Sequence, residues 1–148
     1  MSATNAFETS LLQHIFQNAA IANIGDATGL PASATAGSLY VSLHTADPGE
    51  AGAQNTSEVS YTGYARQAVA RSGSGWTVSG NNASNAAAVA FGPCVSGSAT
   101  ITHFGIGTAS SGAGNLLFRG ALTDLISVTT SSNATQTFAI GTLDVDVD

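Results

Sequence analysis

The chain has 148 residues with a formal net charge of −6 at pH 7, and only 8% of its residues are charged. This length is typical of one domain that buries its own hydrophobic core. The cations are Arg66, Arg71 and Arg119, and lysine is absent. Such a chain cannot neutralise several phosphates, so nucleic-acid binding and attraction to an anionic membrane surface are both disfavoured.

Cysteine content and the first residues bear on where the protein is made. Cys94 is the single cysteine, so no disulfide can form within the chain. The first residues carry no basic segment, and no apolar run approaches the ~20 residues of a membrane span. We therefore expect a protein that is made in a cytoplasm and stays there until it assembles.

The first expected element is an amphipathic helix over residues 5–23. Asn5 suits the N-cap, Glu8 three residues later suits a capping box, and Gly25 suits the stop. We expect the apolar face of this helix to lie on the chain's own sheet, with a neighbouring subunit as the alternative. That face consists of Leu11, Leu12, Ile15, Phe16 and Ala19.

Residues 24–37 are a connector rich in Gly, Pro, Ser and Ala, and strand patterns recur at short spacing over residues 38–148. This spacing favours an antiparallel β-sandwich or a barrel-like domain over βαβ units. The sequence thus predicts a single, mainly β domain over residues 1–148 with one N-terminal α-helix. The expected strands are Leu39–Thr45, Ala65–Arg71, Trp76–Ser79, Ala86–Phe91, Ala99–Ile106, Asn115–Gly120, Ile126–Thr130 and Phe138–Val147, the last with a break at Gly141.

Residues 46–63 form a long loop without a periodic pattern. Loops longer than about 12–15 residues are usually functional or disordered. The loop opens with a turn at Asp47-Pro48-Gly49 and contains Asp47, Glu50 and Glu58 but no cation. We expect it to be an exposed acidic arm whose carboxylates are solvated, although they could gather a hard cation.

The acidic C-terminus offers a second calcium alternative, because Asp144, Asp146 and Asp148 begin like a calcium-binding loop. The glycine and the final glutamate of such a loop are missing. The pattern instead favours a terminal strand in which Leu143, Val145 and Val147 face inward and the acids face solvent.

Histidine spacing does not favour a metal site. His14, His44 and His103 lie far apart in the sequence and lack the spacing of zinc ligands. We expect His44 and His103 to bond to backbone groups or to face another subunit.

Catalytic patterns are also missing from the sequence. It has no Gly-x-Ser-x-Gly elbow and no lysine, and Cys94 has no evident partner. The glycines of Gly105-Ile-Gly107 and Gly112-Ala-Gly114 do not complete a phosphate-binding motif, so we expect them to mark bulges or close backbone approach. The sequence therefore predicts no enzyme, no cofactor and no metal.

The residues most suited to an interface are the scarce arginines, the start of the long loop and the apolar helix face. We expect each arginine to pair with an acid, either within the subunit or across a contact. The candidate interface residues are Phe7, Leu11, Leu12, Ile15, Phe16, Asp47, Pro48, Glu50, Arg66, Arg71 and Arg119.

Five segments spread over nearly the whole chain carry a resemblance to a known family. They are Asn5–Leu12, Leu39–Gly52, Tyr61–Arg66, Gly75–Asn81 and His103–Ala109. Together they resemble small virion proteins of tailed bacteriophages, often labelled tail-fibre proteins. The resemblance implies a virion structural protein made in the host bacterial cytoplasm, and it assigns no catalytic residues.

Two placements in the virion follow from the resemblance. Fibres usually have longer chains and repeats, which favours a capsid decoration, or cement, protein that stabilises the assembled head by binding it in many copies. The alternative is a tail-fibre or tail-tip component that contacts the host surface, and a further alternative is a β-sandwich binding module of unknown partner. Expected partners are the major capsid protein or other virion proteins, and we expect a homo-oligomer, with a trimer favoured.

Overall fold

The computed structural model describes residues 2–131 and 135–147. The chain folds into two compact units, each assembled from separate stretches of sequence. Unit 1 consists of Met1–Ser38, Val69–Val89 and Phe138–Asp148, and unit 2 consists of Leu39–Ala68 and Ala90–Thr137. The single domain that the length predicts stays a prediction.

Unit 1 begins with helix α1, Asn5–Gln17. The predicted end near residue 23 is wrong, because Asn18 adopts the left-handed conformation with φ 56° and stops the helix. Asparagine tolerates this conformation better than most residues. Its side chain also exchanges two hydrogen bonds with the backbone of Ser33, which fastens the connector to the end of the helix.

The predicted capping box is also wrong. Thr4, not Asn5, is the N-cap, and it makes no side-chain capping bond. The backbone N–H groups of Phe7 and Glu8 both bond to the carbonyl oxygen of Thr4. Because the N-cap is Thr4, Glu8 is the fourth helical residue and not the third, so it does not stand where a capping box requires it.

An antiparallel sheet of three strands completes unit 1, in the order β3 (Trp76–Ser79), β4 (Asn82–Asn85) and β9 (Asp144–Asp146). β3 has the predicted bounds. β4 lies outside the predicted strands, since Asn-Ala-Ser-Asn has little β-propensity. The alternation predicted for the C-terminal strand is confirmed, because Val145 is buried and Asp144 and Asp146 are exposed.

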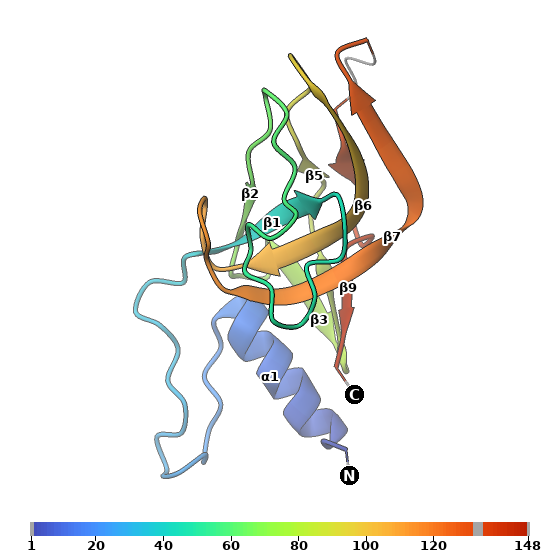
Figure 1. Ribbon diagram of the computed structural model, residues 1–148. Coiled ribbons are helices and arrows are strands. Elements are labelled where there is room, and N and C mark those ends of the chain that lie inside the picture. Colours follow the sequence, from blue (N-terminus) through green and yellow to red (C-terminus); the bar gives the residue numbers. More distant parts are fainter. Residues whose placement is uncertain (1, 132–134, 148) are drawn as a thin grey trace. The chain divides into compact units, whose positions relative to one another are not determined.

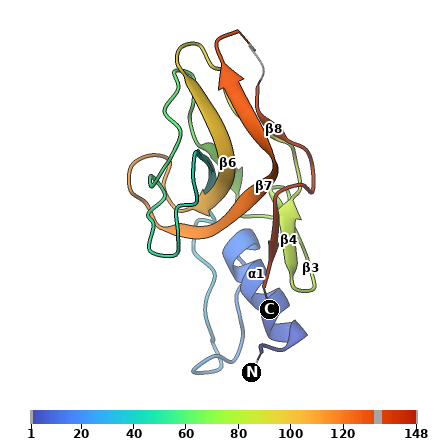
Figure 2. The same cartoon turned by 45° about the vertical axis from the view of Figure 1, so that its right-hand side comes forward.

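Helix α1 packs on strands β3 and β4 of its own unit (Figure 2). The ring of Phe16 meets the indole of Trp76 edge-on, with 4.7 Å between the centroids. Gln17 donates a hydrogen bond of 2.8 Å to the carbonyl of Trp76, and Thr9 donates one of 2.8 Å to the carbonyl of Gly80. The expectation that the helix lies on the chain's own sheet is confirmed.

Unit 2 is built around long antiparallel strands. The sheet order is β2 (Gln67–Ala70), β1 (Ser38–His44), β6 (Ser98–Gly107) and β7 (Leu116–Thr129), and Figure 1 shows β6 and β7 side by side. Residues 67–68 of β2 belong to unit 2 and residues 69–70 to unit 1. Two short strands, β5 (Val89–Ala90) and β8 (Thr137–Phe138), pair separately.

Strand β7 joins two predicted strands, Asn115–Gly120 and Ile126–Thr130, into one. Ile101 faces Ile126 while His103 faces Ala121, so residues 122–125 of β7 lie opposite Thr102 alone. This bulge lets the strand continue through a stretch whose side-chain pattern is irregular.

The other strand predictions hold in part. Leu39–Thr45 and Ala99–Ile106 correspond to β1 and β6, while Ala65–Arg71 shortens to β2. Ala86–Phe91 reduces to β5, and Phe138–Val147 divides into the end of β8 and β9. Gly141 interrupts the last segment with φ 75°, which confirms the predicted break.

The predicted fold class, mainly β with antiparallel sheets and one N-terminal helix, is confirmed. In the described part of the chain, no helix combines the length and the hydrophobicity needed to cross a membrane.

Candidate functional site

The long loop, residues 46–63, is packed into unit 2 at its middle, so the prediction of an exposed arm is wrong. Gln54 is fully buried. Its amide Nε2 donates to the carbonyl of Tyr40 at 2.9 Å, and its Oε1 accepts from the N–H of Ala109 at 3.1 Å. Because a buried amide requires its hydrogen bonds, these contacts fix the middle of the loop to strand β1 and to the turn after β6.

Glycines make room for Gln54, as the sequence predicts for close backbone approach. A Cβ atom at Gly107 would overlap the Gln54 side-chain amide, and one at Gly114 would lie 2.8 Å from Oε1 of Gln54. At either position, a residue larger than glycine would fit only if the Gln54 amide were displaced.

A buried ion pair secures the end of the same loop. Glu58 accepts from Nε and from a terminal nitrogen of Arg66, each at 2.7 Å, and the two side chains are 15% and 2% exposed. Arg66 also donates to the carbonyls of Ala109 and Gly112 at 2.9 and 2.6 Å. The hydrogen bonds that Arg66 donates to Glu58 are the main cause that raises the pKa of Arg66. Arg66 therefore pairs within its own unit, as one of the two predicted alternatives states.

Tyr64 belongs to the same network. Its hydroxyl accepts from the N–H of Leu43 at 3.1 Å and donates to Glu58 at 2.8 Å. Burial is the main reason that the pKa of Tyr64 is raised. The phenol thus stays protonated and serves as a donor.

His44 is fully buried beside this network. Its Nδ1 lies 2.8 Å from the carbonyl of Thr56, so this nitrogen carries the proton, and Nε2 then accepts from the hydroxyl of Ser42 at 2.8 Å. Burial is the main cause that lowers the pKa of His44, which favours the neutral ring. The predicted backbone bond of His44 is confirmed.

The ion pair of Glu58 and Arg66 borders a hollow of about 300 Å³. The carboxylate of Glu58 and the guanidinium of Arg66 bond to each other, and Arg66 also bonds to backbone carbonyls. This arrangement suits a rigid contact surface rather than chemistry on a substrate. The lining residues are Glu58, Val59, Tyr64, Ala65, Arg66, Ser110, Ser111 and Gly112.

The start of the loop brings several predicted interface residues together. Arg119 contacts both carboxylate oxygens of Asp47, at 2.6 and 2.7 Å, and both side chains are partly exposed. The pKa of Asp47 is lowered, first by the N–H of Gly49 and then by Arg119. Pro48 is buried, while Glu50 is exposed at a hollow of about 210 Å³ that Leu116, Leu117 and Arg119 also line.

The apolar helix residues of the candidate interface are mostly used within unit 1. Leu12 and Phe16 are fully buried, Leu11 and Ile15 are half-buried, and Phe7 is 43% exposed. Among them, Phe7 therefore presents the most apolar surface to a partner.

Among the described residues, Arg71 pairs with no acid, contrary to prediction. It donates to the carbonyls of His14 and Ile15, each at 2.6 Å, and to that of Ala36 at 3.1 Å. The last carbonyls of a helix lack intrahelical partners and carry partial negative charge, so a guanidinium there satisfies both needs.

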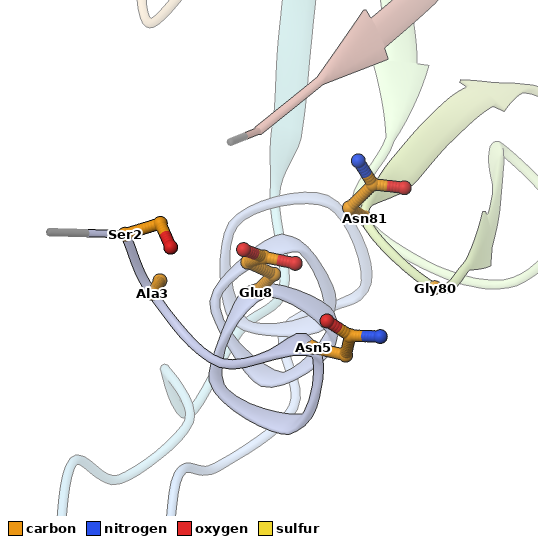
Figure 3. A pocket seen from close by; sticks show the side chains of 6 residues that line it. All are labelled: Ser2, Ala3, Asn5, Glu8, Gly80 and Asn81. Atoms are coloured by element: carbon orange, nitrogen blue, oxygen red, sulfur yellow. The ribbon is translucent and has the colours of Figure 1, made fainter.

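A hollow of about 460 Å³ opens at the N-terminal end of α1, and sequence reasoning missed it (Figure 3). Glu8 lines it with only 7% of its surface exposed. In the sequence, Glu8 itself was the residue that could have indicated this hollow, but the capping-box interpretation gave it another role. The lining residues are Ser2, Ala3, Asn5, Glu8, Gly80 and Asn81.

The remaining polar residues that the sequence analysis considered, the C-terminal acids and two histidines, do not gather in one place. Asp144 and Asp146 share the side-chain amide of Asn82, and Asp148 lies outside the described residues. His14 contacts the carbonyl of Ala19 and His103 contacts the hydroxyl of Thr102. Within residues 2–131 and 135–147, no group of three or more His, Cys, Asp or Glu side chains is placed to share a metal ion.

Comparison with known proteins adds one finding. A family model described as Podophage GP4 fiber I protein gp80 matches residues 2–146. No curated protein matches the chain.

Proposed function

The chain belongs to the family of Podophage GP4 fiber I protein gp80, a family of bacteriophage virion proteins, and from this premise we propose that it is a fibre component of a tailed-phage virion. The match over residues 2–146 is the observation that carries the proposal. The sequence favoured a capsid decoration role because the chain lacks the repeats of fibres. The family description supports the fibre alternative more than that role.

The fibre protein acts by binding, and its contact surface in unit 2 is the start of the long loop with the adjoining part of β7. Asp47, Glu50 and Arg119 supply polar groups there, and Leu117 is 42% exposed beside them. An exposed apolar side chain with polar neighbours resembles the core and rim of protein interfaces. The buried anchors at Gln54 and Glu58 hold this surface rigid, which lowers the entropy lost on binding.

The protein assembles as a homo-oligomer in the virion, with a trimer as the preferred state. The low fraction of charged residues and the exposed ring of Phe7 support contacts between copies. Other virion proteins are the expected partners at the attachment point, and the major capsid protein is the partner if the protein binds the head.

Copy number and location in purified virions test the fibre proposal. Quantitative mass spectrometry against the major capsid protein, together with antibody-gold labelling, should find a few copies to a few dozen copies at the tail or at a fibre. Hundreds of copies spread over the head would overturn the proposal in favour of a capsid decoration protein.

A further inference from the structure

Glu8 is largely buried, and within the described residues its carboxylate has no partner. Its surface is 7% exposed, and no hydrogen bond or ion pair involving its side chain is formed within the described residues. Both of its carboxylate oxygens stay accessible from the hollow, so a cation that enters the hollow can reach them without competing with a protein donor. The arrangement therefore points to a group of opposite charge that binds at this position.

The walls of the hollow offer further oxygen ligands. Figure 3 shows the carboxylate of Glu8 among the six lining residues, with the side chains of Asn5 and Asn81 on two sides and Ser2 on a third. Amide and hydroxyl oxygens together with a carboxylate are the ligands that hard cations prefer, and water completes their coordination. None of the six lining residues is a cation that would compete for the carboxylate.

The charge balance of unit 1 favours the same ligand. Unit 1 contains Glu8, Asp26, Asp144, Asp146 and Asp148 as acids and Arg71 as its one arginine. Arg71 is engaged by the carbonyls at the far end of α1. No arginine of unit 1 therefore competes with a cation for the carboxylate of Glu8.

We propose that the hollow at the start of α1 binds a divalent cation, Ca²⁺ in preference to Mg²⁺, through Glu8 with Asn5, Asn81 and Ser2. Calcium accepts irregular sets of oxygen ligands, whereas magnesium requires near-octahedral geometry. Because the site holds one carboxylate, the expected dissociation constant is weak, on the order of 0.1–1 mM. Binding would fasten the first turn of α1 to the β3–β4 turn.

The test uses the full chain after treatment with a chelator, titrated with CaCl₂ or MgCl₂ and followed by calorimetry and thermal unfolding. Calcium should raise the unfolding temperature of the natural protein. Glu8→Gln should weaken calcium binding by about tenfold or more, because the charged ligand is lost. Asp124→Asn removes an exposed carboxylate of unit 2 that lies outside the proposed contact surface, and it serves as the matched control that keeps the response.

A second measurement guards against a folding defect. Without calcium, Glu8→Gln should unfold at nearly the same temperature as the natural protein, because both side chains have similar volumes and reach the same hollow. The proposal is overturned if calcium has no effect on the natural protein at several millimolar. It is equally overturned if Glu8→Gln, folded by circular dichroism, responds to calcium as the natural protein does. Neither result bears on the fibre proposal, which depends on location in the virion.

Discussion

Gly105 lies directly opposite Ser42 in the sheet, and a Cβ atom at residue 105 would stand 2.7 Å from Nε2 of His44. The same atom would lie 2.8 Å from the hydroxyl of Ser42. Glycine at this position therefore leaves the space in which strand β1 buries the hydrogen-bonded side chains of Ser42 and His44.

Replacing Gly105 by alanine should destabilise the protein. The added methyl group overlaps His44 and Ser42, and overpacking of a filled interior costs about 1–3 kcal/mol in the free energy of unfolding. Urea denaturation followed by tryptophan fluorescence measures the change. Gly73→Ala is the control, because no atom lies within 4 Å of a Cβ there. Equal stability of Gly105→Ala and the natural protein would contradict the described packing.

His44 should make stability depend on pH. Its pKa in the folded protein is lowered below the ordinary value of 6.5, mainly by burial, and the nearby charges of Glu58, Arg66 and His103 modify this shift. The unfolded chain therefore binds the proton more readily, so stability is complete above about pH 6.5 and falls as the pH drops toward the folded-state pKa.

Denaturation between about pH 5 and pH 8 checks this dependence. His44→Asn should flatten the fall in stability relative to the natural protein, because the group that takes up the proton on unfolding is removed. The pKa of Asp47 is lowered, so this carboxyl group titrates below the pH range of the experiment. A slope that survives in His44→Asn would assign the effect to another group.

Removing one member of the buried ion pair should be costly. Arg66→Met leaves the carboxylate of Glu58 largely buried without its partner, and such losses amount to about 3–5 kcal/mol in the free energy of unfolding. The double variant Glu58→Gln with Arg66→Met should recover part of the loss, since no buried charge remains. Equilibrium denaturation of both variants provides the measurement.

The exposed pair of Asp47 and Arg119 is the internal comparison. Arg119→Met should reduce stability much less than Arg66→Met, because solvent screens the pair and water replaces the lost contacts. If the two arginine variants were equally destabilised, burial would not be what separates the pairs.

The face of α1 should divide into residues that stabilise the fold and one that is free to bind. Leu12→Ala should cost about 2–5 kcal/mol, because it opens a cavity beneath a fully buried helix position. Phe7→Ala should change stability little, since its ring is 43% exposed.

Phe7 also tests the proposed trimer. Phe7→Ala should shift the oligomer toward monomer in sedimentation or light scattering if the ring lies between copies. A natural protein that stays monomeric at high concentration would remove the trimer proposal, and an unchanged oligomer in Phe7→Ala would move the contact elsewhere.

Local patterns in the sequence were sufficient for several elements. The period-two alternation of Leu39, Val41 and Leu43 identified β1, and Trp76–Ser79 was predicted with its observed bounds. The glycines at 105 and 107 were correctly expected to permit close approach of other groups. In each case, neighbouring residues carry the information, because side-chain alternation and backbone conformation depend on the local chain.

The tertiary structure alone decided which distant groups meet. Gln54 bonds across the sheet to Tyr40 and Ala109, and Arg71 satisfies carbonyls at the end of a helix more than fifty residues earlier. Glu8 leaves the predicted capping box and lines a hollow with Asn81. Hydrogen bonds and charge pairs of this kind depend on distance in space, which a residue's immediate neighbours in the sequence do not encode.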